Sequence, residues 1–194
     1  MKNKGLIILV VVIAIIAMNA MGTYNGFVEK EENVNRAWSQ VENVYQRRAD
    51  LIPNLVSTVK GYAEHEKETF IAVTEARSKI NNINVGGMMN DPAAFAKFQQ
   101  AQGQLSSALS KLMVVVEKYP DLKANESFLN LQAQLEGTEN RIAVARKRFN
   151  DSAKQYNQVV RKFPGRMWAG LFGFGTKNYF EAETGAEKAP KVEF

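Results

Sequence analysis

The side chains of this chain that could do chemistry gather between residues 47 and 66. This stretch holds the only histidine of the sequence, His65, between Glu64 and Glu66, and the chain has no cysteine. An imidazole beside two carboxylates has the donor atoms of a metal site. Consecutive residues of a helix point about 100° apart, however, so these three side chains would not converge on one ion. We therefore expect neither a metal site nor a cofactor.

Motifs of enzymatic catalysis do not occur in the sequence. Without cysteine there is no thiolate nucleophile, and the serines do not stand in a G-x-S-x-G elbow. The glycines at 170–175 lack the lysine of a phosphate-binding loop and a helix to follow it. We expect no enzymatic activity. A pair of carboxylates on an acidic helix needs no motif, so an enzyme remains the third hypothesis for function.

Charged and amide side chains interrupt otherwise apolar stripes at Arg48, Glu66 and Gln102. A buried charge is costly unless it is paired. One interpretation is that Arg48 and Gln102 fix the register of the helices through hydrogen bonds. The other is that a groove where a partner docks is marked by Arg47, Arg48, Asp50 and Glu66. The candidate partner-binding residues are Arg47, Arg48, Asp50, Tyr62, Glu66 and Trp168.

Three stretches of the sequence have the apolar periodicity of packed helices. Apolar residues recur at alternating spacings of three and four over residues 34–80, 95–119 and 128–163. This spacing puts one stripe on one side of a helix, as in bundles and coiled coils. Short connections make neighbouring helices antiparallel. The predicted fold is all-α: an antiparallel up-and-down bundle of three long helices.

Turn and cap residues set the ends of these helices. A loop is predicted over 81–90, and Asp91-Pro92 supplies an N-cap and a first-turn proline. Pro120 ends the second helix, Asn125 or Ser127 caps the third, and 163–165 ends it. Pro53 lies inside the first stretch, but the stripe keeps its phase across it. We favour a first helix kinked near Pro53. The alternative is two separate helices, which would make four.

The three predicted helices differ in length, so they cannot match end to end. We expect the near part of the first helix to lack a partner, either as a stalk or as a surface for another chain. We expect the third helix to overshoot at the distal end. The aromatic segment 167–174 would then pack over that distal end. A membrane-dipping or partner-binding patch is the alternative for this segment, because exposed aromatic patches mark contacts.

The longest apolar run, at residues 6–21, reads LIILVVVIAIIAMNAM. A spanning helix needs about 20 apolar residues, and the flanking glycines bring this run near that length. We favour an anchor over a cleaved signal peptide. Lys2 and Lys4 precede the run and Glu29, Glu31 and Glu32 follow it, which predicts a cytoplasmic N-terminus and an extracytoplasmic body. The predicted parts are a cytoplasmic N-terminus (1–4), an anchor (5–22), a helical bundle (23–181) and a disordered tail (182–194).

The formal net charge of +5 is small, but the charged residues are unevenly distributed along the chain. Residues 126–166 carry an excess of about four positive charges, including those at 146–148. A basic helix attracts anionic lipid or nucleic acid, whereas the ordinary interpretation is a solvated helix face. No aromatic-rich nucleic-acid motif accompanies these charges, so we expect no nucleic-acid partner.

Several strings of this sequence are those of a known family. They are YNGFV (24–28), WSQV (38–41), RRADLIPNLV (47–56), VKGY (59–62), HE (65–66), YPDLKAN (119–125), LEGTENRIA (135–143), AR (145–146), FN (149–150), YN (156–157), FP (163–164), FGF (172–174) and YF (179–180). Together they resemble the LemA family of bacterial membrane proteins over residues 22–181. Phe149 stands where that family is expected to have tyrosine. The resemblance implies one N-terminal transmembrane helix, an antiparallel helical bundle outside the bacterial inner membrane, and no established enzymatic activity. Some relatives are associated with building internal membrane compartments.

Two hypotheses for function follow from these features, besides the enzyme. The first is a membrane-anchored scaffold or adaptor that presents its bundle to other membrane or envelope proteins, or to copies of itself. The second is a membrane-remodelling or lipid-contacting protein that uses its basic third helix and the aromatic segment with Trp168. The bilayer is a partner in both, and neither needs a cofactor.

Overall fold

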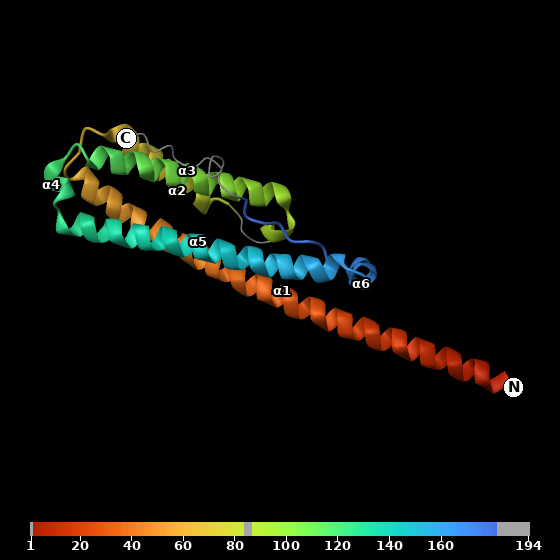
Figure 1. The fold of residues 1–194 in the computed structure, drawn as a ribbon. Helices are drawn as coiled ribbons and strands as arrows, with labels where there is room; N and C mark the ends of the chain where they lie inside the picture. The colour runs from red at the N-terminus through yellow and green to blue at the C-terminus, as the bar shows by residue number, and fades with distance from the viewer. Residues whose placement is uncertain (1, 84–86, 182–194) are drawn as a thin grey trace, which may run out of the picture. The chain divides into compact units, whose positions relative to one another are not determined.

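Most of the described part of the chain is helical. This computed structural model describes residues 2–83 and 87–181, and within them there is no strand. The helices are α1 (Lys2–Lys60), α2 (Lys67–Asn81), the short 3-10 helix η1 (Met88–Asn90), α3 (Pro92–Val116), α4 (Pro120–Lys123), α5 (Glu126–Arg161) and α6 (Gly165–Phe172) (Figure 1). The all-α prediction is confirmed. The predicted disordered tail, 182–194, lies outside the described residues.

The chain divides into two compact units, described here one at a time. The anchor unit comprises Met1–Ser39 and Lys147–Lys177, and the bundle unit comprises Gln40–Arg146 and Asn178–Phe194. Helices α1 and α5 each run through both units, with one part of the helix in each.

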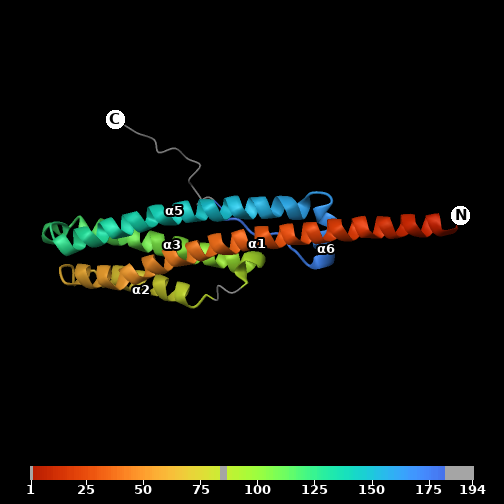
Figure 2. The same cartoon turned by 90° about the horizontal axis from the view of Figure 1, so that it is seen from below.

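The bundle unit is built from the second part of α1, from α2, α3 and α4, and from the first part of α5. Helices α2 and α3 lie side by side in both views (Figure 2). Its apolar core is formed by the residues that the stripes single out, such as Ile52, Val73 and Leu112. The predicted caps are also present. Asp91 accepts hydrogen bonds from the N–H groups of Ala93 and Ala94, at 2.9 and 3.1 Å. Asn125 accepts one from the N–H of Phe128 at 3.0 Å.

The prediction of one kinked helix over 34–80 is wrong about where the helix breaks. Helix α1 runs through Pro53 and ends at Lys60, and the chain turns over residues 61–66 before α2 begins. The N–H of Ala63 bonds to the carbonyl of Val59 at 2.9 Å within this turn. The stripe keeps its phase because both helices present their apolar face to one core. Among the described residues, four helices of at least 15 residues, α1, α2, α3 and α5, contribute to the bundle unit, and the break is not at the proline.

Pro53 is tolerated inside α1 because another side chain replaces the hydrogen bond that it removes. Proline has no N–H, so it cannot donate to the carbonyl of Ala49, four residues earlier. The guanidinium Nε of Arg77, from α2, donates to that carbonyl at 2.9 Å. Ala49 itself is buried. The hydrogen bond from Arg77 thus satisfies a carbonyl that would otherwise be orphaned, which is costly in a buried position.

Replacing Arg77 by leucine is expected to lower the free energy of unfolding by about 1–2 kcal/mol, because the carbonyl of Ala49 loses its donor. In a Pro53→Ala background the same change should cost much less, since alanine restores the N–H that bonds to residue 49. The free energies of the four chains, from urea denaturation in detergent micelles, give the coupling. An equal cost of Arg77→Leu in both backgrounds would contradict this role for Arg77.

The prediction that the aromatic segment caps the distal end is also wrong. Helix α6 lies beside the apolar run, where Trp168 Nε1 donates a hydrogen bond to Asn19 Oδ1 at 3.0 Å. The turn at 61–66 adds one reversal to the chain, so α5 runs back along the first part of α1 instead of away from it. That part of α1 is not an unpartnered stalk either. Phe27, Val34 and Trp38 are buried within the anchor unit.

One described helix, α1, is long and apolar enough to cross a membrane. Its apolar residues are exposed on every side: Leu6 is 66% and Ile15 is 61% accessible. A helix that is apolar all round must be buried in protein or in lipid. Helix α1 therefore has the features of a membrane anchor over residues 6–21.

Candidate functional site

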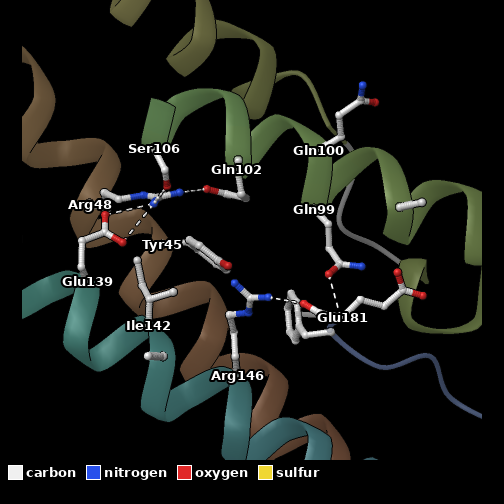
Figure 3. Close-up of a pocket in the computed structure, with 14 residues that line it drawn as sticks. Tyr45, Arg48, Gln99, Gln100, Gln102, Ser106, Glu139, Ile142, Arg146 and Glu181 are labelled. Atoms are coloured by element: carbon white, nitrogen blue, oxygen red, sulfur yellow. Dashed lines mark hydrogen bonds and ion pairs between the residues drawn. The ribbon is translucent and has the colours of Figure 1, made fainter. Parts of the chain in front are cut away.

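The bundle unit contains an open cavity of about 490 Å³. Helices α1, α3 and α5 form its walls, and residues 180–181 form one end (Figure 3). Nine of the fourteen residues that line it have polar or charged side chains. The residues that line it are Tyr45, Arg48, Ala96, Gln99, Gln100, Gln102, Gly103, Ser106, Glu139, Ile142, Ala143, Arg146, Phe180 and Glu181. We call this cavity the α3–α5 groove.

Arg48 connects three helices along this groove. Its guanidinium donates hydrogen bonds to Ser106 Oγ and Glu139 Oε1, both at 3.0 Å, and to Gln102 Oε1. It also lies 5.1 Å from the ring centre of Tyr45. Only 2% of Arg48 is accessible, whereas the side chain of Glu139 is 41% accessible. Arg48 and Gln102 are thus hydrogen-bonded, as the first interpretation of these stripe residues expects, and they bond to each other. The carboxylate of Glu139 neutralises the buried charge from the solvent side.

The other end of the groove holds Phe180 and Glu181, which belong to the non-helical segment after α6. The N–H of Glu181 donates to Gln99 Oε1 at 3.0 Å, and Arg146 donates to the carbonyl of Glu181 at 2.7 Å. The ring of Phe180 is buried beside Phe95, with centroids 4.9 Å apart, and under the guanidinium of Arg146 at 5.0 Å. These side chains bind the main chain of one residue and the side chain of the residue before it.

The side chains of the groove offer many hydrogen-bonding groups. Amide and hydroxyl groups both donate and accept hydrogen bonds, and guanidinium groups donate them, so together they can pair with the N–H and C=O groups of a polypeptide main chain. No group of three His, Asp or Glu side chains able to hold a metal ion occurs in the described part of the chain. The groove offers a set of polar groups that matches an extended peptide.

An aromatic cluster in the anchor unit joins α6 to α1. The ring of Tyr24 meets those of Phe172 and Phe174 edge-on, at 5.2 and 5.6 Å between centroids. Phe174 also lies 5.0 Å from Phe27, and Trp168 stacks on Phe172 at 5.8 Å. Aromatic pairs at such distances contribute about 0.5–1.5 kcal/mol beyond their buried area. We call these five rings the aromatic collar.

A buried polar cluster fixes the segment that follows the collar. Asn157 bonds to both the N–H and the carbonyl of Lys177, at 2.8 and 2.9 Å. The ammonium of Lys177 donates to Glu31 at 2.6 Å and lies 5.2 Å from the ring centre of Tyr156. Burial, and to a lesser extent the carboxylate of Glu31, raises the pKa of Tyr156 to about 12. The phenol therefore stays neutral and Lys177 supplies the charge that Glu31 needs.

The predicted partner-binding residues lie in several different local surroundings. Arg48 faces into the α3–α5 groove, whereas its neighbours Arg47 and Asp50 are exposed. Arg47 lines a second, shallower cavity with Arg141. Asp50 accepts a hydrogen bond from Gln46.

Tyr62 and Glu66 lie at the turn between α1 and α2. The hydroxyl of Tyr62 accepts a hydrogen bond from Asn125 at 3.0 Å. Tyr119 donates a longer one to Glu66, at 3.4 Å. Partial burial, followed by the carboxylate of Glu66, raises the pKa of Tyr119. These residues connect the turn to the end of α3 and the start of α5. Trp168 belongs to the aromatic collar, in the other unit.

The model of the LemA family matches residues 37–194 of this chain. The chain belongs to the LemA family. The resemblance seen in the sequence strings is thereby confirmed. The matched residues include those of the α3–α5 groove and of α6. This LemA-family chain is 28% identical to the magnetosome protein MamQ of Magnetospirillum gryphiswaldense over 200 residues, which are 92% of this chain and 74% of MamQ.

Two further relatives extend the comparison. Magnetosome protein MamQ 2 of Paramagnetospirillum magneticum is 28% identical over 187 residues, which are 88% of this chain and 68% of the relative. Protein LemA of Metamycoplasma hominis is 25% identical over 143 residues, which are 74% and 62% of the two chains. The MamQ relatives and the apolar helix α1 point to a membrane-associated LemA-family protein.

Sequence reasoning missed Gln99, Glu139, Arg146 and Glu181 as parts of the groove. They come from three segments that only the fold brings together, so spacing along the chain carries no sign of them. Asn157 and Lys177 were also missed. An asparagine directly after the stripe residue Tyr156 is a signal that could have been read, because it predicts a buried amide that needs partners.

Proposed function

We propose that this chain is a membrane-anchored, non-enzymatic scaffold whose α3–α5 groove binds an extended segment of another membrane or envelope protein. The observation that carries the proposal is the way the groove holds Phe180 and Glu181. Gln99 and Arg146 bond to main-chain groups of Glu181, and Phe180 is buried as an anchor. A peptide bound beside them would meet groups of the same kind, on Gln100, Gln102 and Ser106.

The predicted membrane anchor is a second, independent argument for a scaffold. A scaffold needs a fixed position, and residues 6–21 would supply it by crossing the bacterial inner membrane. The lysines before this run and the acidic residues after it favour a cytoplasmic N-terminus and an extracytoplasmic bundle. Relatives named as magnetosome proteins fit a role in organising membrane-bound partners. An oligomer follows if the bound segment comes from a second copy of the chain.

Blocking the groove tests this proposal. Gly103 lines the groove, and open space surrounds the position where its side chain would begin. Tyrosine there should fill the groove and abolish capture of the partner by tagged full-length protein from native membranes, with helix content unchanged. Gly137→Tyr is the matched control, because Gly137 is a helical glycine in similar open space that lines a different cavity.

Two results would contradict the proposal. One is the same set of captured proteins for the Gly103→Tyr chain and the natural chain. The other is an equal loss of capture for the Gly103→Tyr and Gly137→Tyr chains, since the α3–α5 groove would then have no special part in binding.

A further inference from the structure

Helix α6 is held at the end of the apolar run, within the anchor unit. Trp168 donates to Asn19, a residue inside that run, at 3.0 Å. Phe172 packs on Tyr24 three residues beyond the end of the run, at 5.2 Å. If residues 6–21 lie in hydrocarbon, Asn19 and Tyr24 mark the level where hydrocarbon gives way to headgroups. Helix α6 therefore lies at that level too.

The outer face of α6 is apolar although nothing in the anchor unit covers it. Met167 is 64% accessible and Leu171, one turn further on, is 71% accessible. Phe163, just before the helix, is 82% accessible. The opposite face is buried through Gly165 and Ala169. Large apolar side chains exposed together on one short helix indicate a contact surface.

Charge favours a lipid surface as the occupant of this face. Residues 152–180 contain no aspartate or glutamate, and the exposed basic residues here are Arg161 and Lys162, just before α6, and Arg166, in its first turn. Basic residues next to an apolar helix face are typical of helices that lie in the plane of a membrane with anionic lipids. Tryptophan and tyrosine are enriched at the same level of a bilayer.

We infer that α6 lies in the headgroup region of the bilayer as a second membrane contact. Met167 and Leu171 would then point toward the acyl chains, and anionic headgroups would bind Arg161, Lys162 and Arg166. This contact is independent of the α3–α5 groove, so it goes beyond the proposed scaffold function. Its effect would be to fix the angle of the anchor unit on the membrane, because a single spanning helix by itself leaves that angle free.

A spin label on α6 tests this inference in the full chain. The natural sequence has no cysteine, so Leu171→Cys gives one labelling site, on a side chain that is already exposed. The labelled protein is placed in vesicles of phosphatidylcholine and phosphatidylglycerol. Collisions with oxygen, which concentrates in lipid, are compared with collisions with a water-soluble nickel chelate. Gln155→Cys is the control, because Gln155 is exposed on α5 in the same unit.

The inference predicts an oxygen-to-nickel collision ratio several-fold higher at position 171 than at position 155, and a smaller difference in vesicles without phosphatidylglycerol. A label at 171 that is as open to the nickel chelate as the label at 155 would place α6 in water and overturn the inference. A label at 171 shielded from both oxygen and nickel would overturn it as well, because a protein surface would then cover this face.

Discussion

Replacing Arg48 by alanine is expected to lower the free energy of unfolding by about 3 kcal/mol, because a buried, paired charge is lost with its hydrogen bonds. Arg48 is 2% accessible and bonds to Ser106, Gln102 and Glu139. Its removal leaves the buried amide of Gln102 without its guanidinium donor. The cost lies toward the lower end of the range for buried ion pairs, since water can reach Glu139 once its partner is gone. Urea denaturation in detergent micelles measures the change.

The neighbouring arginine provides the control for this experiment. Arg47 is exposed, so Arg47→Ala should change the free energy of unfolding by less than about 0.5 kcal/mol. The result decides between the two interpretations of Arg48. A large loss of stability supports a structural part in fixing three helices. A stable Arg48→Ala chain that no longer captures a partner would contradict that part and make Arg48 a docking residue.

Replacing Phe27 by alanine is expected to lower the free energy of unfolding by about 3–5 kcal/mol, as for other buried phenylalanines. Phe27 is 1% accessible and its ring lies 5.0 Å from that of Phe174. A cavity at this position removes the support of the aromatic collar on the side of α1. We therefore also expect α6 to lose its position beside Asn19, which the spin label at 171 would report.

The adjacent residue again gives the matched control. Val28 is 38% accessible, so Val28→Ala should leave both the stability and the label at 171 nearly unchanged. If Phe27→Ala lowered stability without changing the label, Tyr24 and the Trp168–Asn19 hydrogen bond would hold α6 without Phe27. A Phe27→Ala chain as stable as the natural one would contradict the packing described for the collar.

The apolar stripes predicted well which residues are buried. Burial depends on the side of the helix that a residue occupies, and the spacing along the sequence determines that side. The stripe residues from Val34 to Val59 are all buried. The same signal could not show the turn at 61–66, since a heptad phase continues unchanged when two helices share one core. That single omission reversed the predicted direction of α5 and put α6 at the wrong end.

The candidate site was predictable only where its partners lie on the stripes themselves. Arg48 and Gln102 are both stripe residues, so their hydrogen bond could be expected from sequence. Glu139, Arg146 and the segment at 180–181 reach the groove through long-range packing, which no local pattern reports. The donor that replaces the missing N–H of Pro53 could not be predicted for the same reason. Arg77 is an ordinary exposed arginine in the sequence until α2 is placed against α1.

A photoreactive amino acid in the α3–α5 groove tests the central claim most directly. Gln100 lines the groove and is exposed, whereas Gln46 on α1 is exposed outside it. With the full chain in native membranes, the scaffold account predicts that light links position 100, and not position 46, to a protein partner, and that Gly103→Tyr removes this product. Equal crosslinking from both positions, or a product that persists in the Gly103→Tyr chain, would contradict the account.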